Sequence, residues 1–204
     1  MSSPLRLVVL ASGRGSNFQA LLDAIRGLGG PPLDAEIAAL VSDKAGAPVL
    51  ERARAAGIPA ILLGPRKGEA RADYGARLAT EVAARSPDYV LLLGWMRLLS
   101  STFLSRFPGK VVNLHPALPG AFPGTEAIER AYEGYREGKI EKTGVMLHFV
   151  PDEGVDSGPL LACEEVPIGP GESLASLEAR IHETERRLLV STVARLAQRR
   201  ETCP

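Results

Sequence analysis

The sequence predicts an α/β fold: a doubly wound, mostly parallel sheet followed by a long C-terminal helix. Continuous apolar runs are typical of strands buried on both faces, helical patterns alternate with these runs, and glycine or proline stands at the junctions. The 204 residues, 45% of them hydrophobic, suffice for one large domain. We expect a single domain over residues 1–204, with lobes of about residues 1–105 and 106–204.

The expected elements follow from the period of the apolar residues. The expected strands are residues 5–11, 35–41, 58–63, 88–93, 111–115, 143–150 and 160–167. The expected helices begin at about residue 18 and at residues 48, 71, 126 and 172, and the last of them runs to the end of the chain. Strands that alternate with helices at this spacing favour parallel pairing.

A glycine-rich turn joins the first expected strand to the first helix. It reads Ser12-Gly13-Arg14-Gly15-Ser16-Asn17. Glycines let the backbone approach an anion, and a helix N-terminus offers free N–H groups and a positive dipole. Phe18 stands where a dinucleotide-binding loop has its third glycine, which favours a monophosphate. The alternative is a plain turn in which Ser16 caps the helix and Gln19 completes a capping box.

A second motif lies where the strand at residues 111–115 ends. Side chains alternate along a strand, so Asn113 and His115 share one face, and Pro116 stops the strand after them. Ligands of open α/β sheets bind at this carboxyl end. An amide can donate a hydrogen bond to a developing oxyanion, and an imidazole titrates near neutrality. The alternative is a histidine that only caps the strand.

An acidic loop over residues 151–159 contains Asp152, Glu153 and Asp156. Such loops are usually solvated, but Asp156 precedes a Ser-Gly-Pro turn, where its side chain can point inward. A carboxylate there is expected to raise the pKa of His115 by favouring the charged ring.

Two further segments leave their role open. Residues 94–99, Gly94-Trp95-Met96-Arg97-Leu98-Leu99, follow a buried strand and place apolar groups beside an arginine. They fit either the wall of a pocket for a flat ligand or a short helix that packs into the core. On the last helix, His182 and Glu185 lie one turn apart, and we expect His182 to be solvated.

The composition argues against several classes of protein. Lys plus Arg equals Asp plus Glu at 24 each, so no net field attracts nucleic acid or an anionic membrane. The cysteines Cys163 and Cys203 form no CxxC pair, which argues against zinc and fits a reducing compartment. With no long apolar run or signal-peptide pattern, we expect a cytoplasmic protein.

Three chemistries can use the candidate residues. Metal hydrolysis needs clustered ligands, whereas the three histidines lie on separate elements. A serine hydrolase would use Ser16, His115 and Asp156, but no GxSxG elbow is present. Direct group transfer uses Asn113 to polarise a carbonyl, His115 to move protons and Asp156 to support the histidine.

The motifs together closely resemble those of one family, the phosphoribosylglycinamide formyltransferases. The segments that carry the resemblance are ASGRGSNFQALL, GWMRLLS, NLHPALPGAFPG and the stretch from TGVMLHFV to DEGVDSGP, in this order. The resemblance runs from Leu7 to about Val193. It implies a Rossmann-like formyltransferase fold and transfer of a formyl group from 10-formyltetrahydrofolate to the amine of glycinamide ribonucleotide, in purine synthesis. It implies no metal and no covalent enzyme intermediate.

The resemblance also implies roles for individual residues. Asn113 would stabilise the oxyanion, His115 would act as general acid, and Asp156 would keep His115 positioned and protonated. The ribonucleotide would be bound by Gly15, Ser16, Asn17 and Glu185. The folate would be bound by Arg71, Met96, Arg97, Leu98, Leu99, Asn113, Asp152 and Glu153.

Three positions depart from the family pattern. Pro119 is shifted by one residue, Glu126 stands where the family commonly has histidine, and Met146 replaces a common Ser or Thr. Two other functions remain open: a hydrolase of 10-formyltetrahydrofolate, and a non-catalytic nucleotide-binding module. We expect a monomer or a homodimer with small-molecule substrates and no nucleic-acid or membrane partner.

Overall fold

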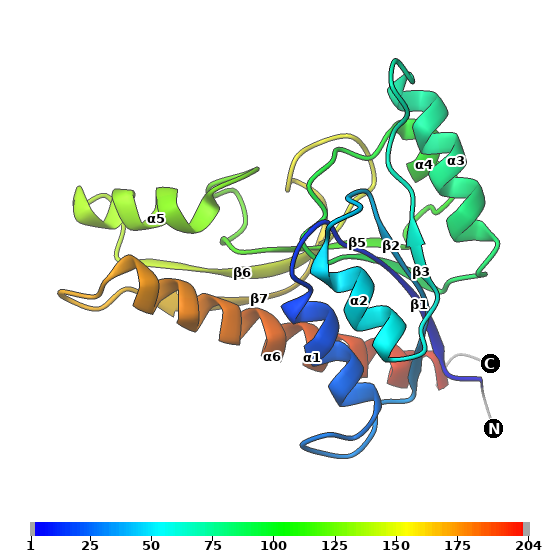
Figure 1. Ribbon diagram of the computed structural model, residues 1–204. Coiled ribbons are helices and arrows are strands. Elements are labelled where there is room, and N and C mark those ends of the chain that lie inside the picture. Colours follow the sequence, from blue (N-terminus) through cyan, green and yellow to red (C-terminus); the bar gives the residue numbers. More distant parts are fainter. Residues whose placement is uncertain (1–2, 202–204) are drawn as a thin grey trace.

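A computed structural model describes residues 3–201, which form a seven-stranded sheet with helices on both faces (Figure 1). The strands are β1 (Leu5–Leu10), β2 (Ala35–Ser42), β3 (Ala60–Leu62), β4 (Tyr89–Leu92), β5 (Val111–His115), β6 (Lys142–Phe149) and β7 (Leu160–Pro167). The helices are α1 (Ser16–Ile25), α2 (Pro48–Ala55), α3 (Arg71–Ala83), α4 (Ser101–Leu104), α5 (Ala127–Arg136) and α6 (Leu174–Glu201). The predicted fold class is confirmed. The expected end of the last helix and Cys203 lie outside the described residues.

The strand order is β3-β2-β1-β4-β5-β6-β7, and the sheet changes character at β5. From β3 to β5 every neighbouring pair is parallel, whereas β6 and β7 are antiparallel to their neighbours. The carboxyl ends of β1, β4 and β5 therefore meet at one edge of the sheet. Since β6 runs the other way, its register places His148 opposite Asn113 and Met146 opposite His115.

Two hydrophobic cores lie on opposite faces of the sheet. Alternation along β1 sends Leu7 and Val9 into one core and Val8 and Leu10 into the other. The first core is covered by α1, α2 and α6, and the second by α3 and α4 (Figure 1). Both faces of the parallel strands are thus buried, which explains why these strands read as continuous apolar runs.

Most observed boundaries lie within two residues of the expected ones, and two elements differ more clearly. β3 is shorter than residues 58–63, because it pairs only with β2 at the edge of the sheet. The sequence pattern did not predict α4, which is a single helical turn. The Ser100 side chain caps this turn and accepts a hydrogen bond from the Phe103 N–H. Such short helices leave little periodicity to detect.

Candidate active site

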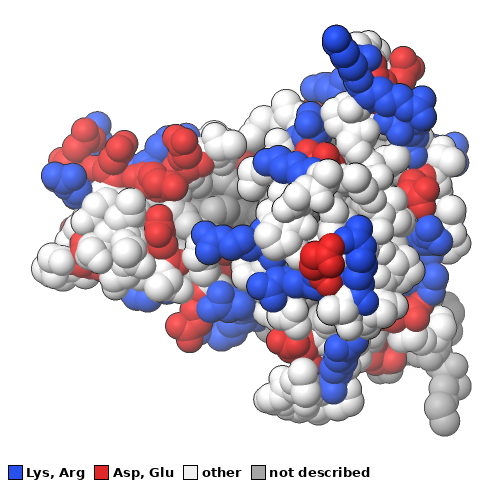
Figure 2. All heavy atoms as spheres, in the orientation of Figure 1, with Lys and Arg blue, Asp and Glu red and all other residues white. Residues whose placement is uncertain are grey.

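A large cavity opens at the carboxyl ends of β1, β4 and β5. Its volume is about 1170 Å³, and in Figure 2 it is the hollow between the end that carries α5 and the rest of the molecule. Its wall includes most of the predicted site residues: Gly15, Ser16, Asn17, Met96, Arg97, Leu98, Leu99, Asn113, His115, Asp152, Glu153, Asp156 and Glu185. Residues separated by up to 170 positions therefore meet in one space. Arg71, a predicted folate-binding residue, is not among the described residues that line this cavity.

The catalytic candidates form one hydrogen-bonded cluster at the junction of β5 and β6. The Asn113 amide donates to Asp156 Oδ1 over 2.8 Å, and His115 Nδ1 lies 3.4 Å from Asp156 Oδ2. Asp156 also accepts a hydrogen bond from the Gly124 N–H over 2.8 Å. The carboxylate thus holds both β5 side chains, although it lies 43 positions from Asn113.

A fourth side chain, His148, belongs to this cluster and was not predicted. Its Nε2 lies 3.3 Å from both Asn113 Nδ2 and Asp156 Oδ1, and its side chain is 2% exposed. Its Nδ1 lies 2.9 Å from the Phe149 carbonyl oxygen, so both ring nitrogens have polar partners. Only the antiparallel pairing of Asn113 with His148 reveals this position.

Burial sets the protonation of His115. It lowers the pKa of the ring below its ordinary value, and this outweighs the nearby Asp156 charge and the hydrogen bond to the Phe122 carbonyl, both of which raise it. Asp156 raises the pKa of His115 as expected, but desolvation of the buried ring is the larger effect, so the net shift is downward. Asp156 still favours the charged ring against that cost.

Asp156 itself remains a carboxylate. Burial favours its neutral form, but hydrogen bonds from His148 and the Gly124 N–H, together with the charge of His115, lower its pKa below the ordinary value. Its side chain is 9% exposed, so a buried negative charge faces the two histidines. This arrangement favours the charged form of the His115 ring.

The glycine-rich loop at residues 12–17 leads into an open helix N-terminus. The N-cap of α1 is Gly15, in the left-handed region at φ 77°, and no side chain caps the helix. The alternative in which Ser16 caps the helix is wrong: Ser16 is the first helical residue, and Gln19 donates to Asp23 instead of reaching back. Asn17 lines the cavity with its Oδ1 buried and unpartnered. The loop is therefore free to bind an anion.

Residues 94–99 form part of the cavity wall, which rejects the short-helix alternative. Arg97 Nε donates to Asp43 Oδ2 over 2.7 Å, and Ser12 Oγ donates to Asp43 Oδ1 over 2.6 Å. The Met96 N–H donates to Ser12 Oγ over 3.1 Å. The segment is thereby tied to the ends of β1 and β2, while Met96 and Leu98 are 61% and 53% exposed.

The acidic loop is tied to the starts of α3 and α4. Glu153 forms an ion pair with Arg71 at the start of α3, and its Oε1 accepts from the Ser101 N–H over 2.6 Å. Arg71 therefore acts on the site through Glu153 rather than as part of the wall. Asp156 adopts a positive φ of 50° in the same loop, which turns its side chain toward the strands.

The last helix brings a histidine–glutamate pair to the same cavity. His182 Nδ1 lies 2.8 Å from Glu185 Oε2, and both residues line the wall. The hydrogen bond to Glu185 raises the pKa of His182. The His182 side chain is half-exposed, as expected of a solvated residue, but it is paired and faces the cavity. In the sequence, the three-residue spacing of His182 and Glu185 on a helix was the feature that could have predicted this pair.

The departures from the family pattern lie around the same site. Glu126 is the N-cap of α5 with φ 57°, and it lines the cavity. Pro119 lies in a turn closed by a 3.0 Å hydrogen bond from the Ala121 N–H to the Leu118 carbonyl. Met146 is 2% exposed, so its position offers no hydroxyl to the cavity.

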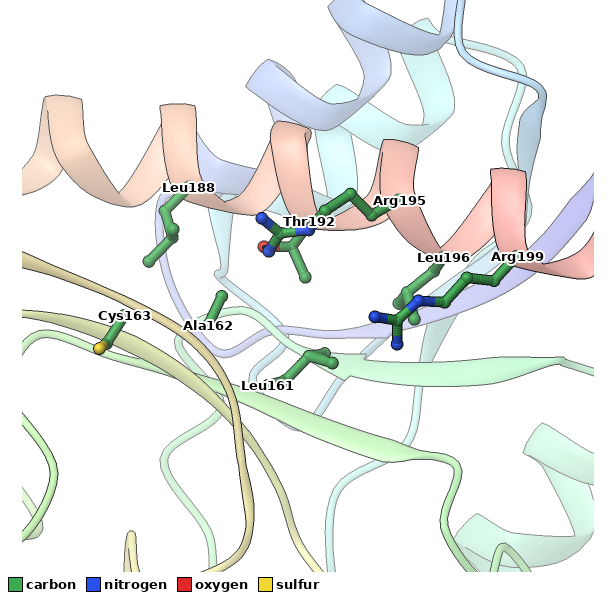
Figure 3. Close-up of a pocket in the computed structure, with 8 residues that line it drawn as sticks. All are labelled: Leu161, Ala162, Cys163, Leu188, Thr192, Arg195, Leu196 and Arg199. Atoms are coloured by element: carbon green, nitrogen blue, oxygen red, sulfur yellow. The ribbon is translucent and has the colours of Figure 1, made fainter.

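A smaller cavity of about 340 Å³ lies between β7 and α6 (Figure 3). Arg195 and Arg199 extend along it from the helix, above Leu161, Ala162 and Cys163 of the strand. No carboxylate, amide or imidazole lines it among residues 3–201. Of these two cavities, only the larger is lined by carboxylate, amide and imidazole side chains of residues 3–201.

Neither a metal site nor a membrane span emerges from the described part of the chain. Residues 3–201 contain no group of three or more His, Cys, Asp or Glu placed to hold a metal ion. No helix within the same range is long and apolar enough to cross a membrane.

Comparisons with known proteins identify the family of this chain. Residues 5–193 match the formyl transferase family. The phosphoribosylglycinamide formyltransferase of Dictyostelium discoideum is 39% identical over 204 residues, covering 94% of this chain and 97% of its own. The enzyme of that name from Schizosaccharomyces pombe is 42% identical over 197 residues, covering 92% and 94%. The crystal structure of glycinamide ribonucleotide transformylase 1 from Geobacillus kaustophilus superposes with a TM-score of 0.85 at 43% identity, covering 94% of this chain and 98% of that one.

The chain therefore belongs to the formyl transferase family. Within that family its place is among the phosphoribosylglycinamide formyltransferases, transferases of purine biosynthesis with a folate-derived formyl donor.

Proposed function

We propose that this protein transfers the formyl group of 10-formyltetrahydrofolate to the amine of glycinamide ribonucleotide. The observation that carries the proposal is the single cavity, in which an open helix N-terminus and a buried Asn–His–Asp cluster lie at the same sheet edge. An anionic substrate and a reacting carbonyl can then be held together, which supplies the proximity that group transfer needs.

In the proposed reaction the substrate amine attacks the formyl carbon, and the carbonyl oxygen becomes an oxyanion. Asn113 stabilises that oxyanion with one of its amide hydrogens. In the free protein these hydrogens face Asp156 Oδ1 and His148 Nε2, so substrate binding replaces one of the two contacts.

His115 moves the proton. Because burial lowers the pKa of the ring, His115 is largely neutral near pH 7 and accepts a proton from the attacking amine. As the bond from carbon to the folate nitrogen breaks, the imidazolium acts as general acid and protonates that nitrogen. Asp156 favours the transient charge and holds the ring through Nδ1. The amine loses one proton and the folate nitrogen gains one, so His115 returns to its starting protonation state.

The two substrates occupy opposite ends of the cavity in this proposal. Gly15, Ser16, Asn17 and Glu185 hold the ribonucleotide, and the wall at 96–99 with the acidic loop holds the folate. Arg71 supports the folate end through Glu153. This division does not coincide with the expected lobes of about residues 1–105 and 106–204, because Glu185 belongs to the second lobe and the wall at 96–99 to the first.

The test follows release of deformylated folate spectroscopically from 10-formyltetrahydrofolate, with and without glycinamide ribonucleotide. Release that requires the ribonucleotide is the expected result. Release at the same rate without it would replace the transferase by a hydrolase. No release in either mixture would favour a binding module.

A further inference from the structure

We propose that Arg52 of α2 positions the phosphate loop at residues 13–17. We also propose that its guanidinium adds a positive charge, beside that of the helix N-terminus, for the phosphate of the ribonucleotide. The inference rests on the proposed function and extends it to a helix that none of the sequence motifs includes. It arises from three contacts through which α2 holds the loop, one from packing and two from hydrogen bonds.

The packing contact lies at Gly15. A Cβ on this glycine would sit 2.4 Å from Val49 Cγ2 and 2.7 Å from Val49 Cβ, so the loop backbone lies directly against α2. Gly15 is also at φ 77°, a conformation that glycine adopts without strain. Only glycine permits both the close approach and the backbone turn into α1.

The hydrogen bonds orient two successive peptide groups. The Val49 N–H donates to the Gly13 carbonyl over 3.2 Å, and Arg52 Nε donates to the Arg14 carbonyl over 2.8 Å. In a trans peptide the N–H points opposite to the carbonyl. With both carbonyls turned to α2, the N–H groups of Arg14 and Gly15 point away from α2, on the side of an approaching anion.

Arg52 also supplies charge at this end of the cavity. Its side chain lines the cavity together with the loop residues, and its Nη1 lies 3.4 Å from Gln19 Oε1, which keeps the guanidinium beside α1. Figure 2 shows Lys and Arg side chains gathered beside the hollow, where α1 and α2 begin. Arg14 and Arg186 line the cavity as well, but Arg52 is the one of the three that bonds the loop backbone.

The experiment compares kinetic constants of the full-length protein and its Arg52→Gln variant. We expect the KM for glycinamide ribonucleotide to rise about 10- to 100-fold, the loss typical of a hydrogen bond to a charged group. The kcat and the KM for 10-formyltetrahydrofolate should stay within about twofold. Arg54→Gln is the matched control: it lies on the same helix, pairs with the exposed Glu51 and does not line the cavity.

A substrate without the phosphate separates the proposed role from a general loss of structure. With glycinamide ribonucleoside, Arg52→Gln and wild type should have the same KM. An equal rise for nucleoside and nucleotide, or no rise for either, would overturn the proposal. Arg52→Lys keeps the charge but loses the Nε hydrogen bond to Arg14, so it should fall between wild type and Gln; wild-type behaviour would overturn the positioning role.

Direct binding of ribose 5-phosphate, measured by calorimetry, keeps this inference distinct from the transferase proposal. If wild type transfers no formyl group, the proposed function fails, yet weaker ribose 5-phosphate binding by Arg52→Gln would still support the role of Arg52. Equal binding by the two proteins would overturn it.

Discussion

The proposed catalytic cluster and the proposed phosphate loop at residues 13–17 share one cavity but differ in construction. Asn113, His115 and Asp156 are side chains in a largely buried cluster, with His115 and Asp156 less than a tenth exposed. The loop at residues 13–17 instead presents backbone N–H groups of an uncapped helix beside exposed arginines. The two ends therefore use different physics for different tasks.

The difference shows what each task requires. Proton transfer needs a group whose pKa the protein can move, and burial moves that of His115. Holding a phosphate needs many donors in a fixed direction and tolerates solvent, so a backbone loop braced by α2 suffices. The parallel half of the sheet supplies the loop, and the antiparallel junction of β5 and β6 supplies the cluster.

The largest effect should come from the cluster. His115→Ala and Asp156→Asn should each lower kcat at least ~100-fold, the usual size of a general acid–base contribution. Steady-state kinetics with both substrates measures this, and circular dichroism with a thermal melt shows whether the variants fold. Two folded variants with near wild-type turnover would contradict the mechanism.

The phosphate loop should respond to changes in its backbone. Gly15→Ala forces a left-handed alanine against Val49, which should lower the free energy of unfolding by about 1–3 kcal/mol and raise the KM for the ribonucleotide about tenfold. Gly13→Ala is the matched control, since a Cβ there meets no atom within 4 Å. Urea unfolding and kinetics test both variants. If the two alanines behave alike, the bracing of the loop by α2 is refuted.

The folate end should be more tolerant. Leu98→Ala removes an exposed side chain from the cavity wall and should raise the KM for 10-formyltetrahydrofolate about fivefold, with stability nearly unchanged. Leu62→Ala, at a similarly exposed leucine outside the wall, serves as its control. Identical folate KM values for the two variants would remove Leu98 from the folate site.

The smallest and most direct comparison is the titration of His115. Its lowered pKa places the acid limb of kcat/KM below the ordinary pKa of histidine, so the rate should fall only in more acidic solution. Asp156 raises this pKa, whereas His148 and Arg130 lower it, so Asp156→Asn should shift the titration to still lower pH. NMR of the histidine ring protons measures the shift. A shift to higher pH would mean that the Asp156 charge does not act on the ring.

Local patterns were sufficient for most of the fold. Continuous apolar runs predicted β1, β2 and β4, because strands buried on both faces leave no alternation. The glycine-rich turn and the pair Asn113 and His115 were also visible, since each lies within a few residues. These local motifs also indicated the resemblance to the formyltransferases, which the comparisons confirm.

Long-range pairing decided the rest. His148 joins the cluster only because β6 is antiparallel to β5, and Arg52 reaches the loop only because α2 packs beside α1. Neither pairing leaves a periodic signal at those positions.

The sequence by itself determined which side chains are available and the approximate position of each strand. The tertiary structure decided their environment: how deeply His115 is buried, and whether Ser16 or Gly15 caps α1. The pKa of a ring depends on desolvation and on charges from every neighbouring element. Those neighbours lie far apart along the chain, so only the folded arrangement fixes the sign of the shift.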